Sequence, residues 1–411
     1  MTVITGVGVV APNGVGLKEF WAATLSGRTG IRELDRFDTS GYPARLAGLV
    51  EGLDPAQHLP STLMAQTDVS TRLALIAAQD AIEDAGVDTS ALRDYDMGVV
   101  TANASGGFDF THREFKKLWS LGPEHVSVYE SFAWFYAVNT GQISIRHKMR
   151  GPSIALVAEQ AGGLDALGQA RRVARTGVPL VVCGGVDSAF DPWGWASHLA
   201  GGRVSLDPDP ATAYRPFDRH AAGYVPGEGG AICVVEDPAA ARARGARVYG
   251  EIAGHAATFD PAPGTGRPPG LGRAARLALA DAGIGPDAVD VVFADAAGLP
   301  ALDRAEAEAL RDLFGAGGVP VTAPKSLTGR LFSGGGVLDV VAALMSIREG
   351  VIPPTSEAVS PPDDYGLDLV VGEPRPAAVE TALVLARGRW GFNAAVVIHL
   401  AQNGIRPCPN R

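Results

Sequence analysis

Two stretches of the chain, 73–106 and 277–298, share the same order of apolar and polar positions. Each reads as an apolar helix that stops at a glycine, followed by a short apolar strand that ends in small residues. A second matching pair, 162–177 and 335–350, begins with two glycines, continues as an apolar helix and ends at a glycine. This repetition predicts a duplicated α/β unit.

Short apolar runs without polar alternation, such as 179–183 and 231–235, predict strands that are covered on both faces. Helical segments rich in small residues, such as 276–282, are suited to close packing between sheets. We therefore expect a layered α/β fold with helices sandwiched between two sheets. The segment 236–244 combines an acidic N-cap, a proline and good helix formers, which predicts a helix at the junction of two halves, 1–240 and 241–411.

Composition narrows the class of protein. The 411 residues carry a net charge of -10, which argues against nucleic acid and anionic membranes as partners. The three cysteines, Cys183, Cys233 and Cys408, lack the spacing of a metal site, and we expect neither a metal nor a cofactor. The apolar run 3–11 lacks a cationic leader and is followed by Pro12, so it predicts neither a signal peptide nor a membrane span, and a cytoplasmic protein.

The same N-terminal run contains Gly6-x-Gly8-x-x-Ala11, the outline of a dinucleotide-binding turn. In that motif the glycines open a helix whose N-terminus meets the pyrophosphate. Here Pro12 and the residues after it continue a loop, so we expect no nucleotide site.

The run 157–166 places Gln160 where a predicted strand meets a glycine-flanked helix start. Many enzymes place a nucleophile at such a turn. An amide has no proton to lose near neutral pH and no lone pair comparable to that of a thiolate, so Gln160 is excluded from covalent catalysis.

Five short motifs follow one another along the chain. They are Gln160 followed by Ala-Gly-Gly-Leu-Asp, Tyr-Arg-Pro-Phe-Asp at 214–218 with Gly-Glu-Gly-Gly at 227–230, Asp-Arg-x-Glu at 303–306, Lys-Ser-x-x-Gly at 325–329, and Gly-Phe-Asn at 391–393. In this order they resemble the β-ketoacyl synthases, over nearly the whole chain. The resemblance implies a thiolase-like α-β-α-β-α fold with internal duplication.

Condensing members of that family use a cysteine and two histidines. By the motif order, Gln160 stands in place of the cysteine, Asp295 in place of the first histidine and Arg330 in place of the second. The chain therefore resembles the ketosynthase β subunit, or chain-length factor, of bacterial type II aromatic polyketide synthases. The resemblance implies a heterodimer with a catalytic α subunit, an interface tunnel that limits the growing poly-β-keto chain, and an acyl carrier protein as a further partner.

The segment 108–136 is rich in aromatic residues, which are Phe108, Phe110, Phe115, Trp119, Tyr129, Phe132, Trp134, Phe135 and Tyr136. We expect a partner chain to bury it. Within a predicted helix, Phe108, Thr111 and Phe115 form one stripe. The spacing alone also suits an ordinary core stripe, whereas the resemblance implies that these residues line the tunnel. We therefore expect them to gate chain length, with an octaketide as the product.

Gln160 permits an alternative function. In some loading ketosynthases a glutamine at this position accompanies decarboxylation of malonyl groups, because an amide can donate a hydrogen bond to a thioester carbonyl as enolate charge develops. Decarboxylation of malonyl carrier protein therefore remains an alternative to the function of a non-condensing subunit. Against it, we expect Asp295 and Arg330 to pair and fill the pocket, with each side chain facing solvent as the other possibility.

Two further segments carry less information. The basic run 146–150 suits either contact with an acidic carrier protein or a solvated surface. The run 388–391 departs from the flexible Gly-Phe-Gly-Gly loop of the family, which further disfavours a working acyl-enzyme site.

Overall fold

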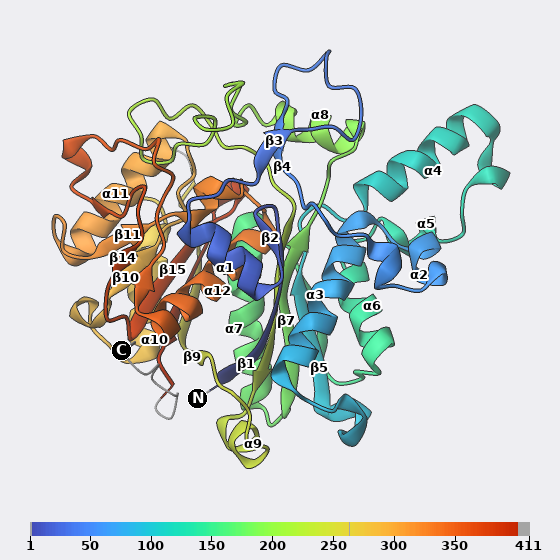
Figure 1. Ribbon diagram of the computed structural model, residues 1–411, viewed down its shortest axis with the longest axis horizontal. Coiled ribbons are helices and arrows are strands. Elements are labelled where there is room, and N and C mark those ends of the chain that lie inside the picture. Colours follow the sequence, from blue (N-terminus) through green and yellow to red (C-terminus); the bar gives the residue numbers. More distant parts are fainter. Residues whose placement is uncertain (1, 263, 402–411) are drawn as a thin grey trace.

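One long mixed sheet forms the frame of the molecule (Figure 1). The computed structural model describes residues 2–262 and 264–401. Along the sheet the strands follow the order β13-β11-β10-β15-β16-β9-β1-β8-β7-β5-β6, and β2 pairs with β1. The strands of this sheet are β1 Val3–Ala11, β2 Gly14–Val15, β5 Met97–Ala102, β6 Ser153–Leu156, β7 Leu180–Asp187, β8 Gly229–Glu236, β9 Gly250–Phe259, β10 Val291–Phe293, β11 Pro320–Thr322, β13 Asp368–Leu369, β15 Thr381–Arg387 and β16 Phe392–His399.

Two small ribbons and a set of helices complete the fold. The ribbons pair β3 Ile31–Glu33 with β4 Leu46–Gly48, and β12 Val351–Ile352 with β14 Arg375–Pro376. The α-helices are α1 Leu17–Leu25, α2 Ser61–Gln66, α3 Val69–Ala85, α4 Phe108–Leu121, α5 Glu130–Ala133, α6 Val138–His147, α7 Gly162–Arg175, α8 Pro192–Ala200, α9 Pro238–Ala243, α10 Leu271–Ala282, α11 Pro300–Phe314 and α12 Ser333–Glu349.

The strand order confirms the predicted duplication. Read inward from its outer edge, the first half of the sheet runs β6-β5-β7-β8-β1. The second half runs β11-β10-β15-β16-β9, with the short strand β13 added outside β11. The two halves match strand for strand in chain order, and in both the three outer strands are parallel and the inner ones antiparallel. The repeated helices match as well, because α3 corresponds to α10 and α7 to α12. Helix α9 lies between the halves, with Asp237 as its N-cap as predicted.

The expected pair of separate sheets is replaced by two halves that hydrogen bonds join into one. Val3 and Ile4 of β1 pair with Glu251 and Gly250 of β9. Helices α7 and α12 nevertheless lie between the two halves, as the layered fold requires. The segment 276–282 does not lie between the two halves of the sheet as predicted, because it belongs to α10, which covers the outer face of the second half.

Close packing against the sheet explains why these layers form. A Cβ atom at Gly8 of β1 would lie 1.9 Å from the carbonyl oxygen of Ala77 on α3, and one at Gly254 of β9 would lie 2.1 Å from that of Ala278 on α10. The next residue of β9, His255, points to the other face and packs against Gly168 of α7. The glycines of the Gly6-x-Gly8 outline therefore serve helix packing.

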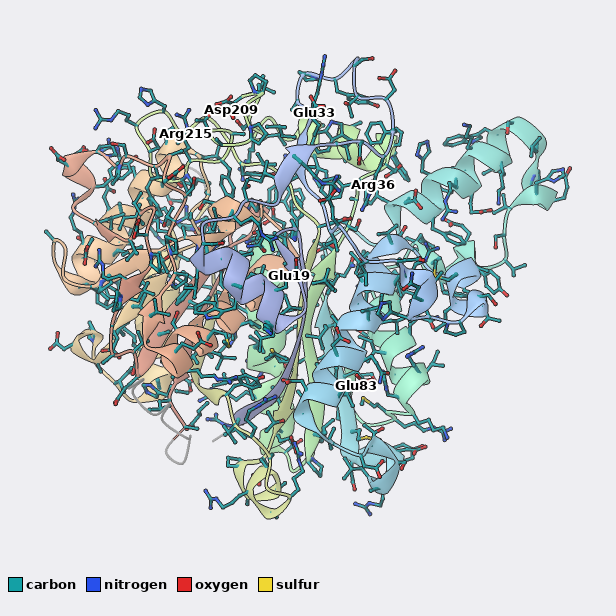
Figure 2. The ribbon with its side chains drawn as sticks, in the orientation of Figure 1. Glu19, Glu33, Arg36, Glu83, Asp209 and Arg215 are labelled. Carbon is teal, nitrogen blue, oxygen red and sulfur yellow. The ribbon has the colours of Figure 1, made fainter. Side chains whose placement is uncertain are left out.

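Charged side chains cover the outside of these layers. Glu19 on α1, Glu83 on α3 and Asp209 in the loop before β8, which Figure 2 labels, are exposed. Among the described residues, no helix combines the length and apolar character needed to cross a membrane. Helix α4, by contrast, projects from the body in Figure 1.

Candidate functional site

Gln160 lies at the turn that the sequence predicts, between β6 and α7. A short 3-10 helix, Glu159–Ala161, makes this turn, and Glu159 adopts a left-handed backbone conformation with φ of 51°. The Gln160 side chain is fully buried. Neither Nε2 nor Oε1 finds a hydrogen-bond partner among the described residues. The amide packs against Gly335 of α12, where a Cβ atom would lie 2.2 Å from Nε2.

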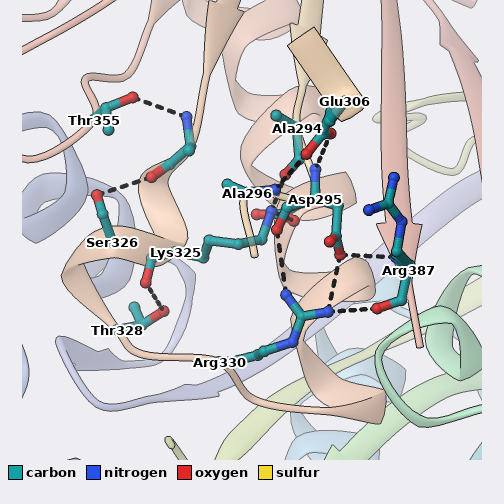
Figure 3. A network of polar contacts seen from close by, with 12 residues as sticks. Ala294, Asp295, Ala296, Glu306, Lys325, Ser326, Thr328, Arg330, Thr355 and Arg387 are labelled. Carbon is teal, nitrogen blue, oxygen red and sulfur yellow. Dashed lines mark hydrogen bonds and ion pairs between the residues drawn. The ribbon is translucent and has the colours of Figure 1, made fainter. Parts of the chain in front are cut away.

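Asp295 and Arg330 form the predicted ion pair. Arg330 Nη2 lies 3.0 Å from Asp295 Oδ1, and both side chains are buried. Arg330 also donates to the backbone carbonyls of Asp295 and Arg387, while the Arg387 N–H donates to Asp295 Oδ1 at 2.7 Å (Figure 3). Oδ1 of Asp295 therefore holds both the guanidinium and the end of β15, while Oδ2 is buried and has no hydrogen-bond partner among the described residues. The alternative, in which each faces solvent, is excluded.

A second layer of buried charge fixes the loop that carries Asp295. Glu306 on α11 accepts the N–H of Asp295 at 2.7 Å and that of Ala296 at 2.9 Å (Figure 3). Ala296 needs this support because its φ is 52°, in the left-handed region. Lys325 forms an ion pair with Asp339 on α12 at 2.6 Å and donates to the Ala294 carbonyl.

Burial and neighbouring charges set the protonation of this cluster. Burial, reinforced by the charge of Asp295, raises the pKa of Glu306 to about 7. Burial raises the pKa of Asp303, which accepts the N–H groups of Phe217 and Gly298, also to about 7. For Arg330, burial acts to lower the pKa, but the charges of Asp295 and Glu159 outweigh it and raise the pKa. The guanidinium therefore stays charged.

Only a small cavity is left beside the ion pair. Its volume is about 20 Å³, and its lining includes Glu159, Tyr224, Arg330 and Arg387. That volume holds about one water molecule. The segment 388–391 borders it: the Arg389 N–H donates to Glu159 Oε2 at 2.9 Å, and the following tryptophan is exposed.

The predicted stripe on α4 lies apart from this cluster and faces α8. The ring of Trp193 on α8 lies 5.0 Å from that of Phe108 and 5.8 Å from that of Phe115, measured between centroids. Phe108 and Phe115 are only partly buried, whereas Thr111 is buried. The core-facing aromatic residue of α4 is Phe110. The interpretation of Phe108 and Phe115 as part of an ordinary core stripe is therefore wrong.

The aromatic segment is left partly uncovered in the single chain. Trp119 is 78% exposed, and the exposed aromatic triplet, Trp134, Phe135 and Tyr136, follows α5. The triplet lies beside the start of α4, because the Gly107 N–H donates to the Trp134 carbonyl at 3.2 Å. Nearby, β6 is an edge strand of the sheet and, within the part of the chain that the structure describes, pairs with β5 alone. The triplet and the start of the stripe therefore lie close together after the C-terminal end of β5, the strand that pairs with the edge strand β6.

Trp193 is the residue at this place that the sequence reasoning missed. Asp191 and Pro192 are a helix-start signal that locates α8. Nothing in that local signal shows that α8 meets α4, because the two helices are far apart in the sequence.

The basic run 146–150 spans the end of α6 and the residues after it. Its Met149 is buried, and Arg150 Nε lies 3.4 Å from Asp94 Oδ2. Cys408 lies outside the described residues.

Two family models match this chain. The model for the beta-ketoacyl synthase N-terminal domain matches residues 2–241, and that for the C-terminal domain matches residues 249–358. The chain belongs to the β-ketoacyl synthase family. Its fold is accordingly the layered ketosynthase fold of that family, as the sequence motifs predicted.

Relatives within the family span nearly the whole chain. Actinorhodin polyketide putative beta-ketoacyl synthase 2 of Streptomyces coelicolor is 69% identical over 396 residues, which cover 96% of this chain and 97% of the relative. Tetracenomycin polyketide synthase ketoacyl synthase beta subunit of Streptomyces glaucescens is 56% identical over 398 residues, which cover 96% and 97%. Among solved structures, the ishigamide ketosynthase/chain length factor has a TM-score of 0.89 at 28% identity and covers 97% of this chain and 99% of its own. The predicted resemblance to ketosynthase β subunits is confirmed.

Proposed function

We propose that this chain is the non-condensing β subunit of a heterodimeric type II polyketide ketosynthase. In this proposal it shapes a tunnel at the interface with a catalytic α subunit and limits the length of the poly-β-keto chain. The observation that carries the proposal is the buried Asp295–Arg330 pair, in which Arg330 lines the same small cavity as Glu159, the sequence neighbour of Gln160. An amide at position 160 offers no nucleophile for acyl transfer, and the Asp295 carboxylate is held by the Arg330 guanidinium.

The cysteines support the same conclusion. Cys183 on β7 and Cys233 on β8 are free thiols that lie opposite each other in the sheet, and both are fully buried. Burial raises the pKa of the Cys183 thiol well above its usual range and that of Cys233 to about 12. Neither supplies a thiolate near neutral pH, so neither takes the role of the absent nucleophile.

Two features support a partner chain. The exposed aromatic triplet is too large an apolar group to be left to water at no cost, and β6 offers unpaired backbone groups at the edge of the sheet. An α subunit that pairs with this edge and covers the rings would satisfy both. The proposal further includes an acyl carrier protein and its poly-β-keto chain as partners, and a cytoplasmic location.

Chain-length control is assigned to Phe108, Thr111 and Phe115. The rings of Phe108 and Phe115 are partly exposed on the side of α4 that faces α8, so they can contact a chain that runs between subunits. Large rings remove space that another ketide unit would need, because packed interiors do not stretch to admit it. Their size supports a product of octaketide length.

The first prediction tests this assignment. With an α subunit and malonyl carrier protein, the Phe108→Ala/Phe115→Ala variant should make chains longer than the wild-type product, since each substitution opens roughly the volume of a ring. Product mass, measured by mass spectrometry, reports the result. Gln160→Ala should leave product length unchanged. As a matched control, Phe110→Ala empties a ring from the core side of the same helix and should lower stability without lengthening the product. Unchanged lengths in the double variant would place the gate elsewhere.

The second candidate function is decarboxylation of malonyl carrier protein through Gln160. The observation that favours it is the unpartnered amide, whose Nε2 has a hydrogen bond to offer to a thioester carbonyl. The same pocket also argues against it, because the amide is fully buried and the neighbouring cavity holds about one water molecule.

Release of carbon dioxide from malonyl carrier protein separates the two functions. The β subunit alone should release none above the background of carrier protein in buffer, and the complex should lose no priming activity when Gln160 is changed to Ala. Release by the isolated subunit that Gln160→Ala abolishes would establish the decarboxylase.

A further inference from the structure

A buried carboxylate joins α4 to α8 beside the proposed gate. Asp191 Oδ2 lies 2.5 Å from His112 Nδ1, and His112 comes between Phe108 and Phe115 on the same side of α4. The Asp191 side chain is nearly inaccessible, whereas that of His112 is 34% exposed. One contact therefore links the two helices that carry the facing rings.

The same carboxylate also begins α8. Asp191 is its N-cap: Oδ2 accepts the Trp193 N–H at 3.1 Å, and Oδ1 accepts the Gly194 N–H at 3.0 Å. Trp193 thus receives its backbone position from the residue that binds His112. Its ring then fills the space beside Phe108 and Phe115.

Other contacts hold α8 in place without this pair. Trp195 is fully buried, and its Nε1 donates to the Ala44 carbonyl at 3.2 Å. At its own start, α4 is held by the Phe110 N–H, which donates to Asp68. Beyond that first turn α4 projects from the body (Figure 1), and the His112 contact and the Phe115–Trp193 ring contact join it to α8.

We propose that His112 and Asp191 are positioning residues for chain-length control: their contact holds the Trp193 ring against Phe108 and Phe115 and so fixes the width of the gate. The proposal rests on the proposed function, since it adds to the gate the pair that holds it shut. Without the contact, α4 and the first turn of α8 separate, and a longer chain fits between them.

Variants of each partner test the proposal in the reconstituted complex with an α subunit and malonyl carrier protein. His112→Ala removes the donor. Asp191→Ser keeps an N-cap for α8 but is too short to reach His112. Each should raise the ratio of longer to wild-type-length product about fivefold, as expected for the loss of one partly solvated, charge-assisted hydrogen bond. Because both remove the same contact, the double variant should add nothing further.

Two controls separate positioning from general damage to the helix. His112→Asn places an amide N–H near the site of Nδ1 and should restore the wild-type ratio. Lys116→Ala changes an exposed residue one helical turn from His112 and should have no effect. Equal lengthening by His112→Ala and His112→Asn would overturn the proposal, because a helix-wide effect would then explain both. If Asp191→Ser does not fold, the two His112 variants alone decide.

The Phe108→Ala/Phe115→Ala variant is included in the same series. If it lengthens the product while His112→Ala and Asp191→Ser do not, the positioning proposal is wrong and the proposed function stands. If it leaves the product unchanged, the gate itself is misplaced and both proposals fail.

Discussion

At the scale of single residues, the site is a network of buried charges around the Asp295–Arg330 pair. Arg330 is held by the carboxylate and carbonyl of Asp295 and by the Arg387 carbonyl, and Glu306 holds the backbone of the Asp295 loop. A buried ion pair contributes little net stability, because desolvation offsets its attraction. Breaking one side of it, however, leaves an uncompensated charge in the core.

The ion pair therefore predicts a non-additive pair of variants. Arg330→Met should lower the free energy of unfolding by about 3–5 kcal/mol, because Asp295 is left charged and buried. Adding Asp295→Asn should recover part of that loss, since the amide removes the charge and still accepts the Arg387 N–H. Urea denaturation of the single and double variants provides the measurement. Arg93→Ala, which breaks an exposed pair with Asp96, should have little effect. A double variant less stable than Arg330→Met would contradict the pairing argument.

The order of motifs was enough to predict that Asp295 and Arg330 meet. Each follows from counting within its own motif, and opposite charges in one buried pocket must pair. The support around them was not predictable, because Lys325 and Asp339 or Glu306 and the Ala296 backbone come together only through the folded sheet. Local patterns carry no signal for such contacts between distant segments.

At the scale of elements, α4 is the helix on which the proposed function depends. Its start after Gly107 agrees with the sequence, as does the stripe on one side. Its surroundings could not be predicted, because a helical repeat gives the direction of a face and not the neighbour that the face meets. The start of α4 is fixed by Asp68, which caps α3 and accepts the Phe110 N–H at 2.9 Å.

Asp68 predicts a pH dependence of stability. Burial raises its pKa from 3.8 to about 7, although the N–H groups of Phe110 and Ser70 act in the opposite direction. Between about pH 4 and 7 the folded protein therefore keeps a proton that the unfolded chain releases, so the contribution of Asp68 to stability is lost as the pH rises through this window.

Asp68→Asn cannot titrate, and comparison with it isolates this effect. The difference in unfolding free energy between wild type and Asp68→Asn should fall as the pH rises from 5 to 7, by at most ~1.4 kcal/mol per pH unit, the limit for one proton. Denaturation by urea at several pH values measures the slope. A difference that grows with pH would mean that the two N–H donors outweigh burial and that the pKa is lowered.

At the scale of the whole molecule, the duplicated sheet leaves one side for assembly. Helices cover both faces of the sheet in each half, and the pairing of β1 with β9 joins the two halves. The duplication was predictable from the sequence because each repeat carries its own helix, glycine stop and strand. The joining of the halves into one sheet was not, because it depends on two residue pairs that no periodicity marks.

Assembly through the exposed aromatic triplet predicts a selective loss of binding. Phe135→Lys should abolish copurification with the α subunit, because burial of an unpaired ammonium costs more than the lost ring contact. The fold should remain, since the side chain is 40% exposed in the single chain. Phe259→Lys makes the same change at an exposed ring on the other half, at the end of β9, and should still copurify. Wild-type binding by Phe135→Lys would move the interface elsewhere.

The closed pocket also bears on ancestry. In the proposed function the chain descends from condensing enzymes, and a return to catalysis needs changes at three places. Asp295→His alone strands the Arg330 charge, Arg330→His alone strands that of Asp295, and Gln160→Cys alone places a thiol beside a filled pocket. A stranded buried charge costs about 3–5 kcal/mol, a large part of the 5–15 kcal/mol that typically holds a domain folded. The ion pair therefore makes the loss of catalysis hard to reverse, because a single substitution of either partner destabilises the fold.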